Sequence, residues 1–149
     1  MAAVQRSILA RHPDVSVVVV CANLGSETGP AAVAAAAAGR QVDILVNNSG
    51  TAGNQYLGAV TADEFARQYA VNVRGPLLLV QAVCDALPRD RSGRIVNISS
   101  ISSSMGLMAQ SVYGGTKAAL EAMTRTWARE LAERATVNAV NPGPVDTRM

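Results

Sequence analysis

Four short apolar runs, rich in β-branched residues, alternate along this chain with longer stretches that favour helices. The runs are Val15–Ala22, Val42–Val46, Arg94–Ile98 and Thr136–Val140. Such runs are typical of strands that are buried on both faces of a parallel sheet. Because strands that alternate with helices form βαβ units, the pattern predicts an α/β fold. We expect a parallel sheet of about four strands in one domain, residues 1–149, with the strand at 15–22 beside the strand at 42–47.

The helical stretches lie at residues 5–11, 26–39, 61–87 and 111–133. Pro30 is tolerated in the first turn of a helix. Thr61, followed three residues later by Glu64, has the pattern of a capping box that opens a helix. Gly75-Pro76 falls inside the third stretch, where it predicts an interruption or a kink.

The composition excludes several classes of function. Hydrophobic residues make up 49% of the chain and charged residues 16%, which is typical of a globular domain. The net charge is only +2 and the arginines are scattered, so we expect no nucleic-acid partner. The longest apolar run, at 17–22, is too short to cross a bilayer, and the first residues resemble no signal peptide. These features predict a cytoplasmic protein without membrane contact.

Cysteine and histidine are scarce. Cys21 and Cys84 fit two reduced thiols and make no metal motif. His12 is the only histidine, so a Ser-His-Asp triad or a histidine-based zinc site would depend on that one residue. We therefore expect neither a metal site nor such a triad.

Small polar residues gather where each predicted strand ends. In parallel sheets, ligands bind at the carboxyl ends of the strands. The segments at those ends are Asn23-Leu24, Asn47–Gly50, Ser99-Ser100 and Asn141–Thr147. We expect the chemistry of the protein to lie among these four loops.

Tyr113 and Lys117 are four residues apart on a predicted helix, so they project from one face. A phenol is a weak acid-base catalyst at neutral pH, and an ammonium held nearby favours the phenolate. The alternative is a solvated lysine beside a partly buried tyrosine. Of the 13 Lys and Arg residues, only Lys117 is a lysine, which favours a functional pair.

Two other residues are candidates on weaker grounds. Ser100 ends the third predicted strand, and its hydroxyl could donate a hydrogen bond to a carbonyl oxygen that gains charge. Asn72 lies inside a predicted helix, where asparagine is disfavoured. The alternatives are an ordinary loop serine and a local distortion of the helix.

Five motifs occur in order and cover most of the chain. They are the strand and loop Val42–Gly50, the helical Asn72, the serine strand Ile95–Ser100, the Tyr-x-x-x-Lys at 113–117, and the Pro-Gly loop within Asn138–Thr147. Together they resemble the short-chain dehydrogenase/reductase family. Asn23 stands where many members have Asp, and Ser49 replaces the usual Ala.

The resemblance implies a partial Rossmann-type, doubly wound fold and NAD(P)(H)-dependent hydride transfer between a small-molecule carbonyl and an alcohol. Tyr113 would be the general acid/base, and Lys117 would bind the nicotinamide ribose and assist the phenol. Ser100 would orient the carbonyl, while Asn72 would hold a relay water. The cofactor, NADP or NAD with a slight preference for NADP, would be bound by Asn23, Leu24, Asn48, Gly50, Tyr113, Lys117, Val145 and Thr147.

Parts of the family pattern are missing from the sequence. No Gly-rich turn for the pyrophosphate precedes the first strand, and the chain ends at Met149, before the family's substrate-binding helix. The helices would lie mainly on one face of the sheet, with only 5–11 left for the other. We therefore expect the isolated chain to bind NAD(P) very weakly. The alternative is a non-catalytic remnant that acts through helix-mediated association.

Self-association is expected through the helices at 61–87 and 111–133, because family members commonly form dimers through the equivalent pair. Trp127 lies on the second of these helices, beyond Lys117. It is either part of that surface or part of the core.

Overall fold

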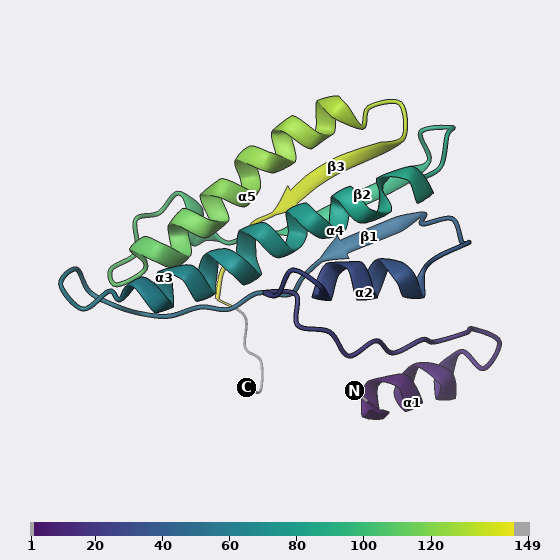
Figure 1. Cartoon of the computed structure of the whole chain (residues 1–149), viewed down its shortest axis with the longest axis horizontal. Helices are drawn as coiled ribbons and strands as arrows, with labels where there is room; N and C mark the ends of the chain where they lie inside the picture. Colours follow the sequence, from purple (N-terminus) through teal and green to yellow (C-terminus); the bar gives the residue numbers. More distant parts are fainter. Residues whose placement is uncertain (1, 145–149) are drawn as a thin grey trace.

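A three-stranded parallel sheet forms the centre of the computed structural model, which describes residues 2–144. The strands are β1 (Ile44–Asn47), β2 (Gly93–Ile98) and β3 (Ala135–Val140), in the order β1-β2-β3. Leu45 pairs with Ile95, which pairs in turn with Val137. The main helices are α1 (Ala2–Arg11), α2 (Gly29–Ala36), α3 (Ala62–Tyr69), α4 (Gly75–Val83) and α5 (Ser111–Glu130) (Figure 1). The predicted α/β class is confirmed.

The prediction of a strand at 15–22, which would have been the fourth strand of the sheet, is wrong. Within residues 2–144, this segment pairs with no strand and runs between α1 and α2 (Figure 1). A groove of about 530 Å³, lined by Val18, Val20 and Ile44 among others, separates it from β1. Val18 is 58% exposed. A β-branched run favours an extended backbone, but a strand also needs another strand at hydrogen-bonding distance, and none of the described strands lies that close to this run.

The predicted helix at 61–87 is divided into four consecutive helical pieces. Thr61 caps α3, since its Oγ1 accepts a hydrogen bond of 3.2 Å from the backbone N–H of Glu64. A π-helical turn, Ala70–Arg74, then joins α3 to α4, and a short 3-10 turn, Cys84–Ala86, follows α4. At Gly75 a Cβ atom would lie 2.7 Å from the carbonyl oxygen of Leu24, so only glycine allows this contact. The expected interruption is therefore a π turn that ends at Arg74, directly before Gly75.

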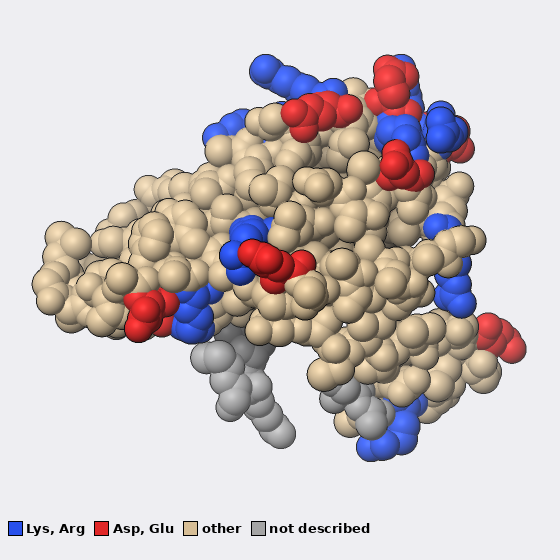
Figure 2. Space-filling model, in the orientation of Figure 1, with Lys and Arg blue, Asp and Glu red and all other residues tan. Residues whose placement is uncertain are grey.

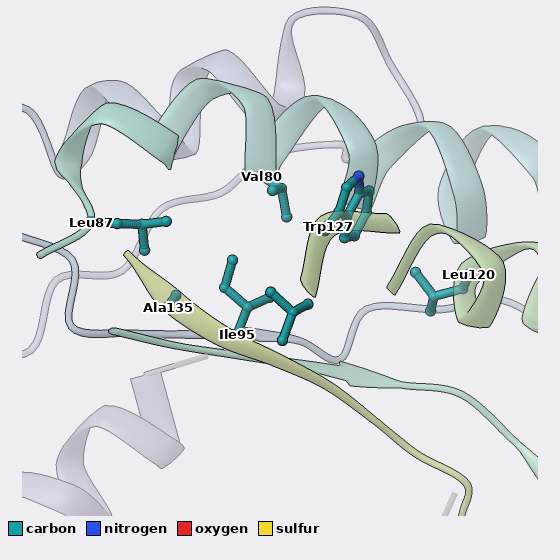
Figure 3. Packing of buried hydrophobic residues seen from close by; sticks show 7 residues of the cluster. Val80, Leu87, Ile95, Leu120, Trp127 and Ala135 are labelled. Atoms are coloured by element: carbon teal, nitrogen blue, oxygen red, sulfur yellow. The ribbon is translucent and has the colours of Figure 1, made fainter. Parts of the chain in front are cut away.

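The hydrophobic core lies between the sheet and the helices α4 and α5 (Figure 3). Its members are Val80, Leu87, Ile95, Leu120, Trp127, Ala135 and Val137. Trp127 is 6% exposed and packs in this cluster, which decides between its two interpretations in favour of the core. Burying such side chains supplies the main favourable term in folding.

The opposite face of the sheet is bare among the described residues. Along β2, Gly93, Ile95 and Asn97 are buried on the helix side. Ile44 and Val46 of β1 point the other way and are more than half exposed, at 65% and 52%. The helices lie mainly on one face, as predicted (Figure 1). No helix in the described part of the chain has the length and hydrophobicity that a membrane span requires.

Candidate active site

The carboxyl ends of the three strands open into one cleft of about 410 Å³. The loop after β1 contributes one wall, the loop after β2 and the first half of α5 contribute the second, and the loop after β3 contributes the third. The residues that line the cleft are Asn48, Gly50, Thr51, Ala52, Ile98, Ser99, Ser100, Tyr113, Lys117, Pro142 and Gly143. Five of the predicted site residues are therefore brought together here.

Lys117 is the buried cation of this cleft, with an exposure of 4%. Its Nζ donates a hydrogen bond of 2.8 Å to the carbonyl oxygen of Ile98, and it lies 5.7 Å from the centroid of the Tyr113 ring. Burial lowers the pKa of the Lys117 ammonium, because the charged form loses its water. The side chain is thus held in place beside the tyrosine, and the interpretation as a solvated lysine does not hold.

A close approach of α5 to the serine loop places Tyr113. Gly114 packs so tightly that a Cβ atom there would lie 2.6 Å from the carbonyl oxygen of Ser102. This contact brings the first turns of α5 against the 3-10 turn Ile101–Ser103 that follows β2. Tyr113 is partly buried and lines the cleft with Ser100.

Ser100 takes part in a short chain of hydrogen bonds. Its Oγ donates to Ser102 Oγ at 3.1 Å and accepts from the Ser102 backbone N–H at 3.2 Å. Ser102 Oγ donates to Gln110 Oε1 at 2.6 Å. A hydroxyl hydrogen rotates freely, so the Ser100 proton can turn toward an oxygen in the cleft while its acceptor contact is kept.

Asn72 lies at the middle of the π turn and is almost fully buried, at 1% exposure. Its Nδ2 donates to the Thr51 carbonyl at 2.7 Å and to Thr116 Oγ1 at 3.0 Å, and its Oδ1 accepts from the Thr51 N–H at 2.8 Å. Asn72 thereby fixes the loop after β1 to α5. Both amide hydrogens are used within the protein, so a relay water would have to donate to Oδ1, and that role stays a prediction.

A second buried amide network was not anticipated from the sequence. Asn47 Nδ2 donates to Asn97 Oδ1 at 2.8 Å, and Asn97 Nδ2 donates to Thr124 Oγ1 at the same distance. Thr124 Oγ1 donates to the Leu120 carbonyl. The network joins β1, β2 and α5 just beneath the cleft. Asparagines at matching positions of two predicted strands were the available signal.

Two predicted cofactor residues lie away from the cleft. The Asn23 side chain accepts a hydrogen bond of 3.0 Å from the Gly25 N–H and thus closes a local turn. Leu24 lines a separate small pocket of about 30 Å³, which also includes Asn48. Their roles in binding the cofactor stay predictions. Val145 and Thr147 lie outside the described residues.

The parallel sheet, with its ligand cleft at the carboxyl ends of the strands, defines a Rossmann-type α/β protein. The family model described as short chain dehydrogenase matches residues 2–149, and the chain belongs to this family. The resemblance that the motifs indicated is thereby confirmed.

Two curated relatives share high identity with the chain. It is 66% identical over 109 residues to an L-xylo-3-hexulose reductase of Hypocrea jecorina. The aligned region covers 70% of this chain and 36% of the relative. The chain is 61% identical over 111 residues to an L-xylulose reductase of Aspergillus niger, covering 70% and 37%. The chain therefore spans little more than a third of the length of these relatives.

The solved structure of an angucycline C-6 ketoreductase with bound NADP superimposes with a TM-score of 0.87. Its sequence is 32% identical, and the match covers 97% of this chain and 58% of that one. The fold of the described residues is thus that of the family.

Proposed function

We propose that the protein is an NAD(P)(H)-dependent oxidoreductase that transfers a hydride between a carbonyl and an alcohol. The observation that carries the proposal is the convergence of Ser100, Tyr113 and Lys117 on one cleft, with the lysine buried beside the tyrosine. A buried, perturbed titratable group in a cleft is a recognised mark of a functional site.

The cleft suits the nicotinamide and ribose half of a dinucleotide. Its volume of about 410 Å³ falls in the usual range of small-molecule sites, and apolar Ile98 and Pro142 stand beside polar groups. Within residues 2–144, the Lys117 ammonium donates only to Ile98, which leaves two hydrogens for ribose hydroxyls. Asn48 and Gly50 would form the other wall. A bound nicotinamide supplies or accepts the hydride, and NADP is favoured because several solved relatives contain it.

The residues of this chain would handle the proton and orient the substrate. The Tyr113 hydroxyl gives its proton to the carbonyl oxygen during reduction and takes it back during oxidation. The Ser100 hydroxyl donates a hydrogen bond to the same oxygen, where negative charge develops. Lys117, held by the Ile98 carbonyl, places an ammonium group near the Tyr113 ring, where it can also bind the ribose.

A ketose is the substrate class that the relatives support best. The two fungal relatives, at 66% and 61% identity, are named as reductases of an L-hexulose and of L-xylulose. The matched relatives also include a 3-oxoacyl-[acyl-carrier-protein] reductase of Thermotoga maritima at 37% identity. The higher identity favours a sugar carbonyl over an acyl-carrier substrate.

We further propose a cytoplasmic homo-oligomer that forms through the helices at 61–87 and 111–133. Phe65 stacks on Tyr69 with ring centroids 4.3 Å apart and is 47% exposed, and Leu77 is 39% exposed. Exposed apolar side chains along neighbouring helices favour association. A non-catalytic protein that acts only through this surface is the alternative.

The face drawn in Figure 2 carries small mixed groups of charge and no basic stripe.

Kinetics of Tyr113→Phe in the full protein test the proposal, with NADPH and L-xylulose as the first substrate pair. We expect kcat to fall by at least about a thousandfold, while the Kd for NADPH changes by less than about threefold, because the phenol acts on the proton in the transition state. Tyr56→Phe, at a tyrosine that is 64% exposed, is the matched control and should behave like the wild type. If Tyr113→Phe kept most of the activity, the acid-base assignment would be wrong.

A further inference from the structure

Glu121 lies one helical turn beyond Lys117 on α5, where its carboxylate meets the loops after β2 and β3. Ser99 Oγ donates a hydrogen bond of 2.8 Å to Glu121 Oε1, and Asn141 Nδ2 donates one of the same length to the same oxygen. Desolvation raises the pKa of Glu121, but hydrogen bonds from Ser103, Ser99 and Asn141 outweigh it and leave that pKa below its usual value. The ionised carboxylate is therefore the form that the site stabilises.

Other contacts join the two loops to each other, and the loop after β2 also reaches α5 through Ser99 Oγ, which lies 3.3 Å from the Lys117 carbonyl, and through the Lys117 hydrogen bond to Ile98. The Ser99 N–H donates to the Val140 carbonyl at 2.7 Å, and the Ile101 N–H donates to the Pro142 carbonyl at 3.3 Å. These bonds continue the pairing of β2 with β3 beyond the ends of the strands. Glu121 is a charged group of α5 that binds both loops at once, and hydrogen bonds to a charged acceptor are the stronger kind.

The loops that Glu121 holds are the ones that carry the proposed chemistry. Ser99 is the residue before Ser100, and Asn141 precedes Pro142 in the third wall of the cleft. We propose that Glu121 is a positioning residue, which holds both loops in register with the helix that carries Tyr113. The proposal rests on the proposed function of the cleft.

Glu121 acts through these loops and not through the lysine. The pKa of Lys117 is shifted by desolvation and by no charged neighbour. The proposed role depends on the place of the Glu121 oxygen that accepts from Ser99 and Asn141, so an uncharged acceptor of the same shape, with weaker hydrogen bonds at the same place, should still hold both loops. Truncation of the side chain should release both loops together.

Three variants of the full protein test the proposal. Glu121→Ala removes the acceptor, Glu121→Gln keeps an acceptor oxygen at the same place, and Glu130→Ala alters an exposed glutamate of the same helix. We expect Glu121→Ala to lower kcat by about 10- to 100-fold, since small displacements at a site have effects of this size. Glu121→Gln should stay within about threefold of the wild type, with an unchanged pH profile, because it keeps the neutral form of the same contacts. Glu130→Ala should have no effect.

A purely stabilising role gives a different result. It would lower the melting temperature of Glu121→Ala while kcat, measured well below that temperature, stays at the wild-type value, and this outcome would overturn the proposal. An equal loss of kcat in Glu121→Gln would also overturn it, because charge and not position would then matter.

Hydrogen exchange separates this inference from the proposed function. The backbone amides of residues 99–105 and 141 should exchange faster in Glu121→Ala than in Glu130→Ala, whether or not any substrate is turned over. Unchanged exchange would refute the positioning role even in an active enzyme. A wild-type protein that is inactive with every carbonyl, but shows faster exchange in Glu121→Ala, would refute the proposed function alone.

Discussion

The segment 93–144 and the segment 2–24 both contain runs of β-branched residues, yet they differ in what surrounds those runs. In the first, β2 lies between two strands and beneath α5, and Ile95 is fully buried. In the second, the run at 15–22 pairs with none of the three described strands, and Val18 and Val19 are 58% and 42% exposed. A hydrogen bond of 3.0 Å from Gln5 Nε2 to the Val17 carbonyl connects α1 to this run.

The difference shows how this fold positions a site. A strand is held rigidly when other strands pair with both of its edges and helices pack on one of its faces. Residues at the carboxyl end of such a strand are then held in fixed positions. Ser100 follows such a strand, and Lys117 projects from the helix packed upon it. Asn23 follows the run without a partner, and its side chain is used in a local turn.

The largest expected difference between the two segments is in core energetics. Ile95→Ala should lower the free energy of unfolding by about 3–5 kcal/mol, because it removes a fully buried side chain and leaves a cavity. Val18→Ala should change it by less than about 0.5 kcal/mol, as is usual at exposed positions. Urea denaturation of the full chain measures both. A loss at Val18 that approached the loss at Ile95 would mean that the run at 15–22 is packed.

A smaller loss is expected at the buried amide network. Asn97→Ala should lower the free energy of unfolding by about 2 kcal/mol, because Asn47 Nδ2 loses its buried acceptor. The matched control is Asn138→Ala, at an exposed asparagine of the neighbouring strand β3, where we expect almost no change. Equal effects at the two asparagines would show that the network contributes nothing to stability.

The smallest effect is expected at Lys117, and it depends on pH. Lys117→Met should raise the free energy of unfolding by about 1 kcal/mol near neutral pH, because a buried ammonium is replaced by an apolar side chain of similar length. Burial lowers the pKa of Lys117 in the folded protein below 10.5, so above that lowered pKa the unfolded chain binds more protons. Wild-type stability should therefore rise with pH through this window, and the advantage of Lys117→Met should shrink.

Denaturation curves at a series of pH values from neutral to 10 measure the difference in the free energy of unfolding between Lys117→Met and the wild type. Arg125→Met, at an exposed position of the same helix, serves as the control and should show no such trend. A gap that widened with rising pH would contradict the assignment of a lowered pKa to Lys117.

Most of the fold could be predicted because its signals are local. The strands at 44–47, 93–98 and 135–140 lie within one or two residues of the predicted runs, and Thr61 caps α3 as its spacing indicated. The strand at 15–22 failed because pairing depends on what lies beside a segment in space. Its composition carries no information about that neighbour.

In the candidate site, too, residues with a local sequence pattern could be predicted, and a residue defined by contacts in space could not. Tyr113 and Lys117 were predicted from their spacing on one helix, and Ser100 from its place after a strand; the cleft brings all three together. Glu121 was missed, because a glutamate on an amphipathic helix has the pattern of a solvated surface residue. Only the meeting of three segments in space gives it partners.

The most direct test of the central claim is a double-mutant cycle on Ser100→Ala and Tyr113→Phe. Side chains that act on one oxygen as a unit lose activity in a strongly non-additive way. We therefore expect kcat/KM of the double variant of the full protein to lie within about fivefold of that of Tyr113→Phe alone. Losses that multiply, so that the double variant falls by the product of the two single effects, would show that Ser100 and Tyr113 do not share one active site.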